Sequence, residues 1–223
     1  MSRDALADSA HDDAVIQQLQ ALREAGETSP EAAQKLDRIG ADIQAVAPYA
    51  VRRELAKTQL FVLQDSLSTD EALGRMEALR KLADTNGDDD TVSLMDIRRI
   101  YMKHADDDIG KFIDQLNEVR AQIHSDASPE VMEALEVSYG NMYFDAGNFD
   151  TALRHQLAAL DWAQKLSVGR ERARLFRLGT IADLYNAMDL PDQALADLDQ
   201  ALTQPAAAIP VQNRISLSAT RVV

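Results

Sequence analysis

The sequence contains no cysteine, and aromatic residues make up only 5% of its 223 residues. The absence of cysteine excludes disulfides, thiolate chemistry and zinc sites built on cysteine ligands. It leaves the compartment open, because reducing and oxidising compartments both hold proteins without cysteine.

Glycine and proline are also scarce, with 9 and 6 residues, and runs of strand-forming residues are almost absent. Ala, Leu, Gln, Glu, Asp and Arg dominate instead, which predicts an all-α protein. No stretch approaches the roughly 18 apolar residues that cross a bilayer, and the N-terminal sequence MSRDALADSAHDDAV lacks the apolar centre of a signal peptide. We expect no direct membrane insertion by this chain.

Basic residues are fewer than acidic residues. The sequence has 23 Lys and Arg residues and 37 Asp and Glu residues, which gives a net charge of −14. Nucleic-acid binding requires clustered Lys and Arg that neutralise phosphates. The composition therefore argues against nucleic acid as a partner, and against an anionic membrane surface for the same reason.

Capping residues and prolines mark a regular series of helix starts. Ser29-Pro30 and Ser128-Pro129 each place a serine before a proline at the first helical position, and Ser68 with Glu71 forms a capping box. The short loops between such starts imply antiparallel neighbours. Together with Gly and Pro breaks, these signals predict helices over 12–25, 30–46, 50–66, 69–84, 91–105, 108–124, 129–146, 149–166, 170–188 and 192–203.

The sequence repeats itself. GNMYFDAGNFDTALRHQLAAL (140–160) aligns without a gap on ADLYNAMDLPDQALADLDQAL (182–202), which places Tyr143 on Tyr185 at a spacing of 42 residues. One spacing earlier, Tyr101 occupies the same position, and a fainter copy has Ala72 at a small-residue position. Agreement of the Tyr, the turn and the small residues indicates structural repeats.

The segment 140–202 resembles tetratricopeptide (TPR) repeats. The resemblance rests on the small residue, tyrosine, turn and paired alanines at Gly140, Tyr143, Gly147-Asn148-Phe149, Ala152 and Ala159. Three features depart from the family: Gln156 replaces the usual aromatic residue, Leu190-Pro191 replaces the Asp-aromatic pair in the second turn, and the period of 42 exceeds the basic repeat of about 34 residues. The resemblance implies a TPR-like α-α superhelix, a solenoid of antiparallel helix pairs.

This resemblance also predicts the domain organisation. We expect a flexible N-terminus over 1–10, degenerate helical repeats over 11–90, TPR-like repeats over 91–204 that are clearest at 129–204, and the start of a further, truncated helix over 205–223.

The acidic segment LADTNGDDDTVSLMD (82–96) begins like a calcium-binding loop, with Asp84, Asn86 and Asp88 at alternate positions. Such a loop needs Gly at its sixth position and a carboxylate at its twelfth. Asp89 and Met95 occupy those positions instead. We therefore predict a connector between two helices, with Asp88, Asp89 and Asp90 capping the second.

No other motif indicates catalysis or a metal site. The four histidines, His11, His104, His124 and His155, have no metal-binding spacing, and phosphate-binding and nucleophile motifs are absent from the sequence. We predict no enzyme activity and no cofactor.

TPR arrays bind partners along a groove lined by the first helix of each pair. By resemblance, the groove residues are Arg99, Met102, Lys103, Asn141, Phe144, Asp145, Asp183 and Asn186. Basic, amide and acidic groups around Phe144 and Met102 suit a peptide or a partner helix. The clamp by which co-chaperone TPRs hold an acidic tail is not expected, because only Asn141 fits it and Val137, Phe176 and Thr180 occupy its other places. We expect Asn141→Ala and Asp145→Ala to weaken a ligand with almost no change in melting.

Two functional classes follow. YFDAGNFDTALRHQLAALDWAQKL is similar to TPR regions that precede GGDEF diguanylate cyclase or histidine kinase domains in bacterial signalling proteins, often on the periplasmic side. The first class is thus a sensory or regulatory module, with the periplasm favoured, that binds a protein or a peptide or forms a homodimer with a second copy of itself. The alternative is a free-standing cytoplasmic TPR adaptor.

Overall fold

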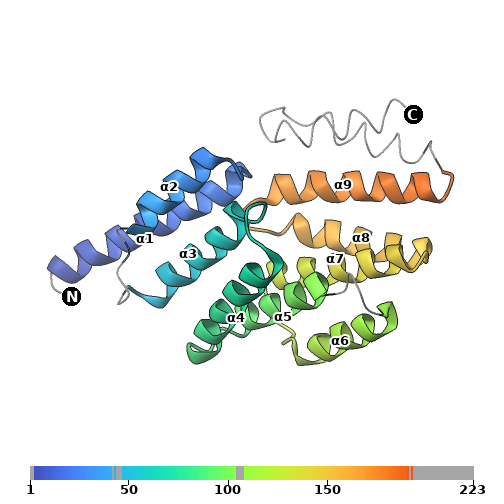
Figure 1. The fold of residues 1–223 in the computed structure, drawn as a ribbon, viewed down its shortest axis with the longest axis horizontal. Helices are drawn as coiled ribbons and strands as arrows, with labels where there is room; N and C mark the ends of the chain where they lie inside the picture. The colour runs from blue at the N-terminus through green and yellow to red at the C-terminus, as the bar shows by residue number, and fades with distance from the viewer. Residues whose placement is uncertain (1–2, 42, 44–46, 104–107, 191, 193–223) are drawn as a thin grey trace. The chain divides into compact units, whose positions relative to one another are not determined.

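The computed structural model describes residues 3–41, 43, 47–103, 108–190 and 192, and these ranges contain helices and no strand (Figure 1). The predicted all-α class is confirmed. The helices are α1 (Arg3–Ala25), α2 (Pro30–Ala41), α3 (Tyr49–Val62), α4 (Thr69–Thr85), α5 (Asp89–Lys103), α6 (Ile109–Gln122), α7 (Pro129–Asp145), α8 (Phe149–Ala163) and α9 (Arg170–Ala187).

Most helices begin where a capping residue or a proline predicts a start. At α4, the Ser68 hydroxyl accepts a hydrogen bond from the Glu71 backbone N–H at 3.3 Å, and the Glu71 carboxylate accepts one from the Ser68 backbone N–H at 2.9 Å. The predicted capping box is therefore confirmed. α2 and α7 begin at Pro30 and Pro129, where the missing N–H of proline costs the helix nothing.

Three boundaries differ from the sequence prediction by more than three residues. α1 begins at Arg3 rather than near residue 12, so it overlaps the segment 1–10 that we expected to be flexible. No Gly or Pro interrupts Arg3–Ala25, and its Ala, Leu and Arg residues favour helix. α2 and α3 end earlier than predicted, at Ala41 and Val62. The tenth predicted helix, 192–203, and the segment 205–223 lie outside the described residues except for Asp192.

The chain divides into two compact units, Met1–Asp88 and Asp89–Val223. In the first unit, α1 packs against α2 and α3, and α3 packs against α4. The Arg23 guanidinium donates a hydrogen bond to the buried Glu54 carboxylate, and this contact joins α1 to α3. The apolar core between α1, α2 and α3 contains Val15, Leu19, Leu22, Ala32, Leu36, Ile39, Val51 and Val62.

In the second unit, α7 packs against α5, α6 and α8, and α8 packs against α9. Gly140, Ala152 and Ala159 are buried where α7 and α8 meet, and both alanines have no exposed surface. Small side chains let two helix backbones approach closely, as the TPR resemblance implies. Leu175 and Leu178 of α9 pack against Leu160 of α8 and extend this core to the next helix.

Within the described ranges, no helix combines the length and the apolar character that a membrane span requires.

Candidate partner-binding face

The residues predicted to contact a ligand lie on α5, α7 and α9, each the first helix of a predicted pair. Five of them are exposed, and the other three are half-buried. The exposed set is Lys103, Phe144, Asp145, Asp183 and Asn186, and the half-buried set is Arg99, Met102 and Asn141.

Three of these predicted residues contact neighbours within their own helix or helix pair. The Arg99 guanidinium forms an ion pair with Asp96 on α5, with 3.1 Å between Nη2 and Oδ1. The Phe144 ring lies 5.5 Å from the Phe149 ring across the turn between α7 and α8. The Asn141 Oδ1 accepts a hydrogen bond from the Gln156 side chain of α8.

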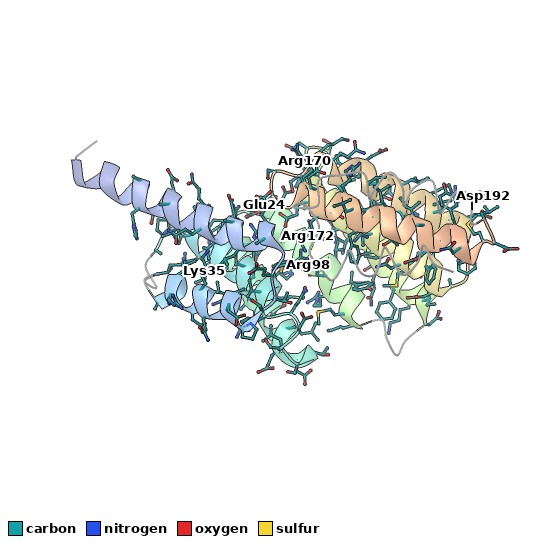
Figure 2. All side chains as sticks on the ribbon, turned by 90° about the horizontal axis from the view of Figure 1, so that it is seen from above. Glu24, Lys35, Arg98, Arg170, Arg172 and Asp192 are labelled. Atoms are coloured by element: carbon teal, nitrogen blue, oxygen red, sulfur yellow. The ribbon has the colours of Figure 1, made fainter. Side chains whose placement is uncertain are left out.

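Four charged residues of α5, α7 and α9 that the sequence did not single out interact electrostatically around one carboxyl group. We call this set, Arg98, Glu133, Arg172 and Arg177, the arginine cluster. Glu133 Oε1 of α7 lies 3.6 Å from Arg177 Nε of α9, and both side chains are largely buried. Arg98 of α5 and Arg172 of α9, both labelled in Figure 2, also act electrostatically on this carboxyl group.

Burial is the largest influence on the pKa values of Glu133 and Arg177. Burial raises the pKa of Glu133 above its usual value, although the positive charges of Arg177, Arg98 and Arg172 oppose this. Burial also lowers the pKa of Arg177, which Glu133 opposes. Glu130, also on α7, acts on the same carboxyl group and raises its pKa further, so both acidic and basic side chains surround Glu133.

A buried amide holds Arg177 in place. Gln156 of α8 is 1% exposed, and its Oε1 accepts a hydrogen bond from Arg177 Nη1 at 3.2 Å. The Nε2 of Gln156 donates to Asn141 Oδ1 of α7 at 2.9 Å. Gln156 replaces the aromatic residue usual in the family, and its amide provides polar partners that an aromatic ring lacks.

Gly140 leaves the space that Gln156 fills. A Cβ atom at position 140 would lie 2.5 Å from Gln156 Nε2, which is closer than real side-chain contacts. The small residue predicted at this position is therefore required by the amide packed against it.

A second polar contact joins α7 and α8. The ring nitrogen Nδ1 of His155 lies 2.7 Å from Glu136 Oε2, and both groups are largely buried. The His155 ring also stacks on Tyr139 and Tyr143, with ring centroids 5.0 Å and 5.4 Å away. This histidine therefore stabilises the helix pair.

The acidic segment 82–96 contains the connector between α4 and α5, as predicted. Gly87 there has a φ of 66°, a left-handed conformation that glycine adopts without strain. Asp88 Oδ2 accepts hydrogen bonds from the Tyr49 hydroxyl at 2.5 Å and from Arg53 Nη1 at 3.0 Å. Asp88 thus contacts α3, and the Asp90 carboxylate accepts a hydrogen bond from the Ser128 backbone N–H at 3.0 Å. The capping of α5 by Asp88, Asp89 and Asp90 stays a prediction. The described part of the chain contains no group of three acidic or histidine side chains arranged to bind a metal ion.

One sequence signal could have indicated the arginine cluster. The segment RERARLFR (170–177) places four arginines in eight residues of an acidic chain. Their partner could not be inferred, because Glu133 lies on a helix two elements earlier.

Comparison with known proteins adds to this geometry. Residues 131–204 match the tetratricopeptide repeat family. This match supports a TPR protein, and it confirms the predicted all-α TPR-like solenoid together with the helix pairs seen in each unit. No curated protein matches the sequence.

The crystal structure of BtubC (BKLC) from P. vanneervenii is similar in fold. The similarity has a TM-score of 0.50, covers 97% of this chain and 86% of that chain, and has 15% sequence identity. At this identity the likeness concerns the fold alone. TPR repeats are generally non-catalytic and mediate protein interactions, which agrees with the expectation of a non-enzymatic interaction module.

Proposed function

We propose that this chain is a non-catalytic interaction module that binds a peptide or a helix of a partner protein along α5, α7 and α9. The observation that carries the proposal is a set of exposed aromatic side chains on these three helices. Tyr101, Phe144 and Phe176 are 39%, 41% and 54% exposed. Exposed aromatic side chains that share a face with polar groups are typical anchors for a partner.

Helical spacing relates each aromatic residue to the arginine cluster. Tyr101 follows Arg98 by three positions on α5, and Phe176 follows Arg172 by four positions on α9. Residues three or four apart lie on one face of a helix. Phe144 follows Glu133 by eleven positions, or about three turns of 3.6 residues, and so lies on the same side of α7. We call the side of these helices that carries the cluster and the three aromatic residues the binding face.

Selection from a displayed library of random short peptides tests this proposal. Peptides recovered on the wild-type protein are measured by fluorescence anisotropy against Phe144→Ala/Phe176→Ala. We expect at least about tenfold weaker binding, or about 1.4 kcal/mol, because buried aromatic anchors dominate such interfaces. Leu157→Ala is the matched control, because Leu157 is 41% exposed but lies on α8.

The proposal is contradicted if the library yields no binding peptide, or if Leu157→Ala weakens peptide binding as much as Phe144→Ala/Phe176→Ala does. Light scattering over a concentration series detects self-association in the same preparation. A dimer that dissociates in Phe144→Ala/Phe176→Ala would identify a second copy of the chain as the occupant of the binding face.

We further propose the narrower role of a sensory or regulatory module of a bacterial signalling protein, followed by a diguanylate cyclase domain. It rests only on the sequence resemblance of 143–166. The coding sequence that follows Val223 tests it: a GGDEF domain supports the role, and another polar helix followed by a stop codon supports a free-standing adaptor.

A further inference from the structure

We infer that Gln156 and Arg177 are positioning residues, which fix the side-chain amide of Asn141 so that its N–H groups donate to a backbone carbonyl oxygen of the partner. This inference rests on the proposed function, and it adds the chemistry of one contact on the binding face. It starts from two hydrogen bonds that share the buried Gln156 amide, one from Arg177 Nη1 at 3.2 Å and one to Asn141 Oδ1 at 2.9 Å.

Arg177 determines which way the Gln156 amide points. A guanidinium has hydrogen-bond donors and no acceptor, so only the carbonyl oxygen of Gln156 can face Arg177 Nη1 favourably. The opposite orientation of the amide would place an NH2 group against a guanidinium N–H. The ion pair between Arg177 Nε and Glu133 Oε1, at 3.6 Å, also holds the guanidinium in place. The NH2 group of Gln156 therefore faces Asn141.

Tight packing confines the Gln156 amide in this position. Gln156 is 1% exposed, and its Nε2 lies so close to the α7 backbone that a Cβ atom at Gly140 would be only 2.5 Å away. Protein interiors of this density hold side chains in one arrangement. The amide is thus fixed between Gly140 and Asn141 of α7 and Arg177 of α9.

This arrangement leaves Asn141 with donors for a partner. Because its Oδ1 accepts from Gln156, its Nδ2 carries two N–H groups with no hydrogen-bond partner among the described residues. Nδ2 is not one of the buried polar atoms that lack a partner, so solvent reaches it. Phe144 follows Asn141 by three positions, which places the amide and the exposed ring on one side of α7. A partner that covers Phe144 must therefore offer an acceptor oxygen to Asn141, or leave these donors unsatisfied at a cost.

The neighbouring charges favour a neutral acceptor over a carboxylate. Asp145 is exposed four positions after Asn141, and Asp183 occupies the equivalent position of the next repeat, at the spacing of 42 residues. Burial alone raises the pKa of Asp183, because no cation offsets its partial loss of solvent. Arg99, at the equivalent position of the preceding repeat, already pairs with Asp96 at 3.1 Å. A backbone carbonyl oxygen has no net charge, so these carboxylates do not repel it as they would a carboxylate.

Two isosteric variants of the full chain test the inference. Asn141→Asp replaces the N–H donors with an acceptor and keeps an oxygen for Gln156. Gln156→Glu accepts from both Arg177 and Asn141, which turns the Asn141 amide so that its oxygen faces the partner. Asn117→Asp on α6 is the matched control, because it adds the same charge and keeps the acceptor of the 2.7 Å hydrogen bond from the Tyr139 hydroxyl.

The probes are the peptides selected on the wild-type protein and neutral versions of them, with an amidated C-terminus and with Asn and Gln in place of any Asp and Glu. We expect the neutral versions to bind the wild-type protein at least as tightly as the originals. They should bind Asn141→Asp and Gln156→Glu at least about fivefold more weakly, because an acceptor then faces an acceptor. Fluorescence anisotropy measures these affinities, and the control should change them by about twofold at most.

Nuclear magnetic resonance distinguishes positioning from a loss of stability. The side-chain N–H resonances of Asn141 should shift when peptide is added to the wild-type protein, and they should not shift in Gln156→Glu. If Gln156→Glu melts early, hydrogen exchange in the wild-type protein decides instead. The Gln156 N–H groups should exchange slowly with and without peptide, since they donate to Asn141 in both states, whereas those of Asn141 should become protected only with peptide.

The inference is overturned if Gln156→Glu binds peptides as tightly as the wild-type protein, if the Asn141 resonances stay unchanged, or if the Gln156 N–H groups exchange as fast as those of free Asn141. It is also overturned if the neutral peptides no longer distinguish Asn141→Asp from the wild-type protein, because the acceptor is then a carboxylate. Peptides that still lose affinity to Phe144→Ala/Phe176→Ala in those cases leave the proposed function standing. Peptides insensitive to all of these substitutions contradict both.

Discussion

Asn141 Oδ1 accepts a hydrogen bond of 2.9 Å from Gln156 Nε2, so a residue predicted to contact a ligand also stabilises the contact between α7 and α8. Gln156 is 1% exposed and accepts a second hydrogen bond from Arg177 at 3.2 Å. One buried amide therefore connects α7, α8 and α9. A change at Asn141 affects the stability of these helices as well as any ligand.

Asn141→Ala should destabilise the protein, which revises the sequence-based expectation of unchanged melting. It removes the acceptor of a buried amide N–H, at a cost of about 1 to 2 kcal/mol. Asp145→Ala, at an exposed position one turn along α7, should change stability by less than about 0.5 kcal/mol. Urea unfolding monitored by circular dichroism measures both. Equal free energies of unfolding for the two variants would show that the hydrogen bond contributes nothing.

Gly140→Ala should destabilise the protein by about 1 to 3 kcal/mol, because its new methyl group would meet the Gln156 amide at 2.5 Å. Gln156→Ala removes that obstacle, so the double variant should be more stable than the sum of the two single effects implies. The four proteins form a double-mutant cycle measured by urea unfolding. A coupling energy near zero would mean that Gln156 moves aside without cost, and Gly74→Ala, with open space around its Cβ position, is the control.

Local signals in the sequence predict the helices well, and they predict the binding face only in part. Ser68, Pro30 and Pro129 act on the first turn of their own helix, so their effect can be read without knowing the fold. The predicted start of the first helix, near residue 12, was too late, although Ser2, a residue type preferred just before a helix, precedes Arg3. The predicted side chains from Arg99 to Asn186 lie on the expected helices, but their role in binding stays a prediction.

The arginine cluster depends on information that the sequence does not carry locally. Glu133 meets Arg177 because α7 and α9 both pack against α8, which brings together residues 44 positions apart. Gln156 could be recognised as a departure from the family, but its partners Asn141 and Arg177 follow from the way the helices cross. The crossing of helices depends on packing along their whole length.

Addition of calcium or magnesium should leave the melting temperature unchanged. The Asp88 carboxylate already accepts hydrogen bonds from Tyr49 and Arg53, and a cation would have to replace both. Asp88→Asn should instead lower the free energy of unfolding by about 1 to 3 kcal/mol, because it weakens a charge-assisted contact to α3. Differential scanning calorimetry with chelator and with excess cation measures both. A rise in melting temperature with calcium that Asp88→Asn abolishes would restore the metal-site interpretation.

The difference in stability between the wild-type protein and Glu133→Gln should depend on pH. Burial raises the pKa of Glu133 in the folded protein above its usual value of 4.5, which applies when the chain is unfolded. Between these two values the folded protein binds more protons than the unfolded chain, so the contribution of Glu133 to stability falls as pH rises. The Gln side chain does not titrate. The loss of the Glu133–Arg177 interaction in the variant therefore lowers its free energy of unfolding by an amount that does not depend on pH.

Urea unfolding at a series of pH values from about 4.5 to neutral should therefore show the wild-type protein losing stability relative to Glu133→Gln as pH rises. Glu71 provides a control of opposite sign, because its hydrogen bonds from the Ser68 side chain and backbone lower its pKa. The wild-type protein should thus lose stability relative to Glu71→Gln as pH falls below 4.5. A Glu133 difference that stays constant or grows with pH would mean that the three arginines outweigh burial at this carboxyl group, and that the cluster holds a fully ionised glutamate.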